Sequence, residues 1–295
     1  MQTTLSESWQ GWIRENHDRG CSKASMIESM VKAGIARSIA ENSLRHLPEV
    51  PVKKAAPHER THLPGAKQAG RVYPKGYVYE DAIVGRDNFV DAEGHAIDVL
   101  ARYKTPEIVV FGNVLSWEEC QELIVRAQPK MERSTIVNSQ SGARDIIPHR
   151  TSDGTFFKRG EDDFILSIEK RLAALMNEPF EHGEGIQVLN YKVGGEYRPH
   201  YDYFPPEQPG SKVHTGESGQ RVATLIVYLN DVPSGGETIF PQAGVSVLPK
   251  LGNGVYFKYM NSRQQLDSMS LHGGEPVRQG EKWIITKWVR ERPFV

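Results

Sequence analysis

Two residues with metal-binding side chains, His200 and Asp202, lie two positions apart inside the stretch from Tyr197 to Phe204. Successive side chains of a strand point to opposite faces, so in an extended segment these two point to the same side while Tyr201 faces away. Imidazole and carboxylate ligands can begin a transition-metal site, and two histidines with one carboxylate form the facial triad of non-heme Fe(II) oxygenases. Because His-x-Asp pairs are common by chance, this hypothesis requires a third ligand elsewhere in the chain.

The best candidate for the third ligand is His272, which is followed by Gly273 and Gly274. Glycines at such a place let the backbone or a ligand approach closely. The three candidate metal ligands are therefore His200, Asp202 and His272.

A lysine opens the last long strand that the sequence predicts, at residues 282–289. Period-two alternation places five side chains on one face of this segment, namely Lys282, Ile284, Thr286, Trp288 and Arg290. If that face lines the interior of a barrel, Lys282 is a buried cation that needs an anionic partner, and a dicarboxylate cosubstrate would supply one. The alternative is a solvated charge at the end of a strand.

Strand patterns dominate the chain from residue 77 onward. Two helices are predicted before the main run of strands, at residues 116–127, where Ser116 and Glu119 have capping-box spacing, and at residues 162–176. The strands predicted after them are 186–191, 197–204, 221–229, 237–241, 245–248, 254–259 and 282–289. Many short strands separated by Gly and Pro turns favour a sandwich or jelly roll, so the predicted class is α+β and mainly β.

The N-terminal part of the chain has a different composition. Residues 1–47 show helical periodicity and predict a small helical module, whereas residues 48–76 are rich in Pro, Gly and basic residues and have the composition of a linker. Residues 77–295 would then form the main domain. Two interpretations of the module stay open: a stabilising arm packed on the main domain, or an independent module that binds a partner or substrate.

Composition restricts the partners of the protein. The formal net charge of -1 provides no overall attraction to nucleic acid or to an anionic membrane surface, so neither is expected as a partner. Only two cysteines occur, Cys21 and Cys120, too few for a disulfide framework. The N-terminus has no secretory pattern and no apolar run approaches the length of a membrane span, so we expect a cytoplasmic location.

The ordered set Tyr191, His200-x-Asp202, His272 and Lys282 resembles the prolyl 4-hydroxylase branch of the 2-oxoglutarate- and Fe(II)-dependent dioxygenases. The resemblance also includes Gly235-Gly236-Glu237-Thr238 and the strand pattern from Arg221 to Asn230, and it covers residues 113–290. It implies a double-stranded β-helix, which is a cupin-like jelly roll, braced by helices and preceded by the small helical module. The N-terminal residues lie outside what the resemblance explains.

The resemblance implies a role for each candidate residue. His200, Asp202 and His272 would be the catalytic iron ligands, and Lys282 would pair with the far carboxylate of 2-oxoglutarate. Tyr191 and Thr238 would be hydrogen-bonding neighbours of that cosubstrate, and Arg221 would contact the substrate. Each of the last three also has a structural alternative: a sheet aromatic for Tyr191, a β-branched strand residue for Thr238 and a solvated strand-end charge for Arg221.

The implied reaction is 4-hydroxylation of prolyl residues in a peptide or protein, with dioxygen consumed and succinate and carbon dioxide produced. Fe(II) and 2-oxoglutarate are the implied cofactors, with ascorbate as a reductant that rescues uncoupled turnover. One alternative is the same chemistry on another side chain or on a free amino acid. Another is a catalytically inactive binding module, and the oligomeric state is left open.

Overall fold

The computed structural model describes residues 5–18, 23–48, 76–85, 87–134, 136–137, 144–145 and 151–295. The chain divides into two compact units, residues 1–69 and 70–295. Almost all of the expected linker lies outside the described residues, so its boundaries at 48 and 76 stay a prediction. In the described part of the chain, no helix is long and apolar enough to cross a bilayer.

The described residues of the smaller unit form three helices, α1 (Glu7–Asp18), α2 (Lys23–Lys32) and α3 (Arg37–Leu44). They enclose a core of their own, because each helix buries apolar side chains that recur at helical spacing. The buried members of this core are Ile13, Met26, Met30, Ala40 and Leu44. The helical pattern predicted for this part of the sequence is therefore present.

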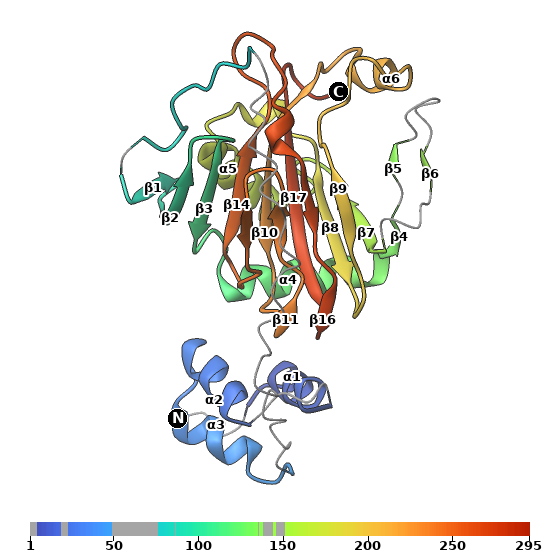
Figure 1. The fold of residues 1–295 in the computed structure, drawn as a ribbon. Helices are drawn as coiled ribbons and strands as arrows, with labels where there is room; N and C mark the ends of the chain where they lie inside the picture. Colours follow the sequence, from blue (N-terminus) through green and yellow to red (C-terminus); the bar gives the residue numbers. More distant parts are fainter. Residues whose placement is uncertain are drawn as a thin grey trace. The chain divides into compact units, whose positions relative to one another are not determined.

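The larger unit is built on a nine-stranded antiparallel sheet. In spatial order, its strands are β1 (Phe89–Ala92), β2 (His95–Tyr103), β3 (Ile108–Gly112), β14 (Gly254–Lys258), β10 (Arg221–Tyr228), β17 (Lys282–Arg290), β8 (Ile186–Tyr191), β7 (Asp153–Phe157) and β4 (Glu132–Arg133). Figure 1 shows that the long central strands β14, β10, β17 and β8 lie side by side.

A second sheet has four strands, in the order β13 (Val245–Val247), β12 (Thr238–Phe240), β15 (His272–Gly274) and β9 (Tyr197–His200). Small pairings complete the described strands: β11 (Ser234–Gly235) with β16 (Val277–Gln279), and β5 (Ile136–Val137) with β6 (Arg144–Asp145).

The path of the chain identifies a double-stranded β-helix. The chain runs from β8 in the large sheet to β9 in the small one, back to β10, on to β12 and β13 in the small sheet, then to β14, β15 and β17 in alternate sheets. All of these pairings are antiparallel. The predicted jelly-roll architecture is confirmed, because short strands separated by turns can bury two faces only by wrapping the chain between two sheets.

Two helices cover the outer face of the large sheet. Helix α4 (Trp117–Ala127) begins with the predicted capping box of Ser116 and Glu119, and α5 (Asp163–Met176) is capped by Asp162. Alternate residues of β10 show the layering: Leu225 packs in the core with the helices, whereas Ile226 packs in a second core between the sheets. Shorter helical turns are α6 (Ser211–Thr215), η1 (Gln128–Lys130), η2 (Phe180–His182) and η3 (Ser268–Ser270).

Candidate active site

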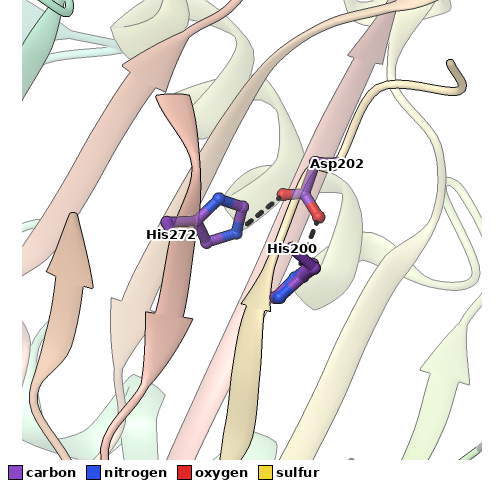
Figure 2. Close-up of side chains that lie close together, drawn as sticks. All are labelled: His200, Asp202 and His272. Carbon is purple, nitrogen blue, oxygen red and sulfur yellow. Dashed lines mark ion pairs between the residues drawn. The ribbon is translucent and has the colours of Figure 1, made fainter. Parts of the chain in front are cut away.

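The fold brings the three predicted ligands together. His200 ends β9 and His272 begins β15, and the two residues face each other in the pairing of those strands. Asp202 lies between them, with 3.5 Å from Oδ1 to His200 Nε2 and 3.5 Å from Oδ2 to His272 Nε2. Figure 2 shows the three side chains converging on one point. One ligand atom from each residue lies within 4.8 Å of the others.

The local backbone differs from the predicted strand 197–204. Strand β9 ends at His200, and Asp202 lies on a bend rather than on the strand. The ladder stops there because β15, the partner of β9, begins at His272, directly opposite His200. The prediction that His200 and Asp202 converge is therefore correct, but the backbone predicted for it is wrong. Asp202 reaches the site from a bend and not from a strand.

Both imidazoles are oriented by backbone carbonyls. His200 Nδ1 lies 2.9 Å from the carbonyl oxygen of Arg198, and His272 Nδ1 lies 3.0 Å from that of Ser270. A carbonyl can only accept, so these contacts assign the ring proton to Nδ1 and leave the Nε2 lone pair free. Metal-binding histidines are typically fixed in this way by a partner of the second nitrogen.

Burial and neighbouring charges set the protonation of the site. Burial lowers the pKa of His272 to about 4, although the charge of Asp202 acts to raise it, so this imidazole is neutral at pH 7. For Asp202, burial alone would raise the pKa, but His272, His200 and Arg221 together outweigh burial and hold the pKa below its ordinary value. A neutral imidazole and an ionised carboxylate are the forms that bind metal.

The triad opens into a cavity of about 740 Å³ between the two sheets. The face of β17 predicted from alternation lines this cavity with all five of its side chains, Lys282, Ile284, Thr286, Trp288 and Arg290. The predicted inward face of this strand is therefore confirmed. Aromatic residues form much of the remaining wall, among them Tyr191, Tyr197, Tyr201 and Phe204.

Lys282 is a buried cation inside this cavity. Its side chain is 2% exposed, and Nζ donates a hydrogen bond of 2.9 Å to the carbonyl of Gly236. Burial lowers its pKa to about 8, although the charge of Glu237 acts in the opposite direction. The alternative of a solvated strand-end charge is therefore wrong for this lysine.

Glycines leave space around the lysine. A Cβ atom on Gly274 would lie 3.2 Å from Lys282 Nζ, and one on Gly236 would lie 3.3 Å from Lys282 Cδ. These two positions form a cradle beside the ammonium group that any larger side chain would fill.

Tyr191 and Thr238 both lie in the same pocket as Lys282. Tyr191 faces Lys282 across the β8–β17 pairing, and its ring centroid lies 4.6 Å from Nζ. Thr238 is buried and accepts a hydrogen bond of 2.8 Å from the hydroxyl of Tyr228. The structure thus places Tyr191 beside the lysine and Thr238 in the lining of the same cavity, and their contact with a cosubstrate stays a prediction.

Arg221 lines the cavity but is held by an acidic partner. Its Nε and Nη2 donate to the two carboxylate oxygens of Glu184 at 2.7 and 2.9 Å, and its guanidinium lies 3.8 Å from the ring centroid of Trp288. Its side chain is 16% exposed, so it is not a solvated strand-end charge. The substrate-binding role predicted for Arg221 remains a prediction.

Comparison with known proteins places this geometry in a family. A model of the 2OG-Fe(II) oxygenase superfamily matches residues 186–290, which contain all of the candidate site residues. The chain is 44% identical over 203 residues to probable prolyl 4-hydroxylase 3 of Arabidopsis thaliana, covering 62% of this chain and 69% of that protein. The chain belongs to the prolyl 4-hydroxylase family. The family predicted from the ordered residues is therefore confirmed.

A second relative of Arabidopsis thaliana agrees with this assignment. Prolyl 4-hydroxylase 5 of Arabidopsis thaliana is 43% identical over 208 residues, covering 64% of this chain and 70% of its own. Among solved structures, the chain is similar to the viral collagen prolyl hydroxylase of Paramecium Bursaria Chlorella virus-1 in its 2OG complex. That match has 31% sequence identity and a TM-score of 0.49, and it covers 62% of this chain and 95% of the viral chain.

Sequence reasoning missed Glu184, a carboxylate that binds two arginines in this prolyl 4-hydroxylase site. Glu184 Oε1 accepts hydrogen bonds from both Arg221 at 2.7 Å and Arg290 at 2.6 Å. Arg290 in turn donates to the carbonyls of His214, in α6, and of Gly219, both in the segment between Asp202 and β10. Glu184 lies between η2 and β8, where no periodic pattern singled it out. The one sequence signal for this cluster was the predicted inward face of β17, which carries Arg290.

The residues present fit both groups that the family implies. Two imidazole nitrogens and one carboxylate are a suitable donor set for Fe(II), and the contacts of both Nδ1 atoms with backbone carbonyls leave the Nε2 atoms to bind it. Among the described residues, the hydrogen-bond acceptor found for Lys282 is a carbonyl, with the glycine cradle beside it. A carboxylate there would supply the buried ammonium with its counter-charge.

Proposed function

We propose that this protein is a prolyl 4-hydroxylase that uses Fe(II), 2-oxoglutarate and dioxygen to hydroxylate prolyl residues of a peptide or protein. The observation that carries the proposal is the placement of the His200, Asp202 and His272 cluster and of the buried Lys282 in one cavity. A barrel kept only for binding has no physical need for all four groups, which argues against an inactive binding module.

The protein's own residues bind and orient the reactants. His200, Asp202 and His272 would hold the metal, while Lys282 would pair with the far carboxylate of 2-oxoglutarate, with Tyr191 and Thr238 beside it. When bound, Fe(II) and 2-oxoglutarate supply the oxidative chemistry, which converts the cosubstrate to succinate and carbon dioxide and adds one oxygen atom to the substrate.

The choice of cosubstrate follows from the lysine. A monocarboxylic oxo acid would leave Lys282 buried without its anionic partner, which costs binding energy. We therefore expect 2-oxoglutarate to be used in strong preference to pyruvate, measured as the ratio of kcat/KM for the two oxo acids.

The choice of target residue rests on the relatives. The proteins of Arabidopsis thaliana that match this chain carry the name prolyl 4-hydroxylase, and the cavity has flat aromatic surfaces, including Tyr197 and Trp288, suited to a pyrrolidine ring. Hydroxylation of another side chain or of a free amino acid would use the same metal and cosubstrate residues. Mass spectrometry of proline-containing peptides after turnover, with mapping of the added oxygen, separates these functions.

His200→Ala tests the metal assignment. Removal of one imidazole ligand is expected to reduce Fe(II)-dependent succinate formation roughly 100-fold or more, because a two-ligand site holds metal poorly. Circular dichroism is expected to show an unchanged fold. The matched control is His46→Ala, an exposed histidine of the smaller unit, and normal turnover in His200→Ala would contradict the ligand assignment.

Two further expectations belong to this proposal. Ascorbate is expected to restore turnover lost in uncoupled cycles, measured as sustained succinate formation in long assays with and without it. A cytoplasmic location is the expectation from composition, and cell fractionation of the native protein tests it.

A further inference from the structure

The three candidate ligands differ in how the fold holds them. His200 and His272 are paired across neighbouring strands, and each ring is also tied to a backbone carbonyl. Asp202 lies on a bend beyond the end of β9, outside the ladder. A carboxylate on a bend has two equivalent oxygens and a free rotation, so something else must decide which oxygen faces the metal.

Thr224 supplies that contact from the opposite sheet. Its Oγ1 donates a hydrogen bond of 2.7 Å to Oδ2 of Asp202. Thr224 lies on β10 with its side chain fully buried, on the strand face that also carries Ile226 and Tyr228 between the two sheets. A buried hydroxyl on an otherwise apolar face requires a partner, and here that partner is a candidate metal ligand.

Tyr259 extends this contact into a chain of hydrogen bonds. The Tyr259 hydroxyl lies 3.2 Å from Thr224 Oγ1, and its ring is fully buried. A threonine hydroxyl has a single proton, which goes to the carboxylate, so Tyr259 must be the donor in its contact with Thr224. The result is a directional chain from Tyr259 to Thr224 to Asp202.

We propose that Thr224, oriented by Tyr259, is a positioning residue that occupies Oδ2 of Asp202 and leaves Oδ1 as the oxygen that binds the metal. The inference rests on the proposed function, because it assigns the metal to the triad. Asp202 Oδ1 lies 3.5 Å from His200 Nε2 and Oδ2 lies 3.5 Å from His272 Nε2, so the hydrogen bond from Thr224 to Oδ2 is what distinguishes the two oxygens. Partners of this kind fix the orientation of metal-binding carboxylates.

The test is metal affinity, measured independently of turnover. Thr224→Val keeps the shape and removes the hydroxyl, and we expect its affinity for Co²⁺, titrated by visible absorption on the full chain, to fall about 10- to 100-fold. Thr224→Ser restores the hydroxyl and is expected to restore affinity to within about threefold of the native protein. In turnover, Thr224→Val is expected to raise the KM for Fe(II) while leaving the KM for 2-oxoglutarate unchanged, since Lys282 is untouched.

Two tyrosines provide a matched comparison for the second link. Tyr259→Phe is expected to weaken Co²⁺ binding by roughly three- to tenfold, the scale of one hydrogen bond. Tyr256→Phe is the control, because the Tyr256 hydroxyl is also buried but has no hydrogen-bond partner among the described residues. Its Co²⁺ affinity is expected to equal that of the native protein.

The outcomes are distinguishable. Native Co²⁺ affinity in Thr224→Val would overturn the proposal, and native affinity in Tyr259→Phe would overturn the role given to Tyr259. If Thr224→Val does not fold, Thr224→Ala with Thr224→Ser as its rescue gives the same comparison. If the native protein binds Co²⁺ as tightly as His200→Ala does, the proposed metal site itself fails, which is a different result from a failure confined to Thr224.

Discussion

At the scale of single residues, burial decides what each ionisable group can do. Lys282 is almost completely enclosed, and burial lowers its pKa to about 8. The ammonium form exists below this pKa and is lost as the pH rises through it. A cosubstrate anion binds the charged form, so its affinity is expected to depend on pH in a range where ordinary lysines do not titrate.

The pH dependence of cosubstrate use follows from this sign. Above about pH 8, kcat/KM for 2-oxoglutarate is expected to fall, approaching a tenfold loss per pH unit, because the free enzyme loses the charge that the anion needs. The measurement is a profile of kcat/KM against pH at saturating Fe(II). A flat profile to about pH 10 would contradict the assignment of Lys282 to the far carboxylate.

Lys282→Met provides the matched control for that profile. It keeps an unbranched side chain without the charge, and its KM for 2-oxoglutarate is expected to rise roughly 30-fold or more, since losing one partner of a buried charge pair costs about 2–5 kcal/mol. Its remaining activity should no longer lose kcat/KM above about pH 8. Native Co²⁺ affinity in this variant would show that the triad is intact.

At the scale of elements, the site depends on how closely β9 approaches β15. A Cβ on Gly273 would lie 2.9 Å from the carbonyl oxygen of Tyr197 and 3.0 Å from the nitrogen of Pro199. Both atoms belong to the backbone of β9, which cannot move aside without moving His200. The glycine next to His272 is therefore required for the two histidines to meet.

Gly273→Ala is expected to separate the strands. Overpacking of this kind costs about 1–3 kcal/mol of folding free energy, and we expect weaker Co²⁺ binding together with a lower Tm. Gly274→Ala is the contrasting variant. Its Cβ would lie 3.2 Å from Nζ of Lys282, the end of a side chain, while the nearest backbone atom, the nitrogen of Tyr197, lies 3.8 Å away. Gly274→Ala should raise the KM for 2-oxoglutarate and leave Co²⁺ affinity unchanged. The same loss of Co²⁺ affinity in both variants would contradict this division.

At the scale of the whole molecule, the two units have separate cores. The core of residues 1–69 is formed by its own three helices, whereas the cores of residues 70–295 lie on the two faces of the large sheet. All candidate site residues belong to the larger unit.

Removal of residues 1–69 tests this independence. A chain that begins at Gly70 is expected to keep Fe(II)- and 2-oxoglutarate-dependent turnover of a short proline peptide within about twofold, because single-site effects far from a cooperative core are usually small. A lower Tm of the truncated chain would instead favour the stabilising-arm interpretation of the module. A rise in KM confined to long substrates would favour the substrate-binding interpretation.

The sequence by itself determined the chemistry of the site. His200, Asp202, His272 and Lys282 could be identified because residue type and order along the chain are readable from the sequence and resemble those of a known family. The strand predicted for Asp202 was wrong, since that residue lies on a bend. Short strands and turns predicted a sandwich or jelly roll, the family resemblance implied the jelly roll, and alternation predicted the inward face of β17. Side-chain alternation along a strand does not depend on which strands pair with it.

The tertiary structure decided which contacts hold those residues in place. Thr224 is 22 positions from Asp202 and reaches it from the other sheet, and Glu184 joins Arg221 to Arg290 across the ends of three separate segments. The end of β9 at His200 also depended on where β15 begins. Such partnerships follow from the register and approach of distant strands, which no local pattern encodes, because a hydrogen bond depends on distances set only when the sheets pack.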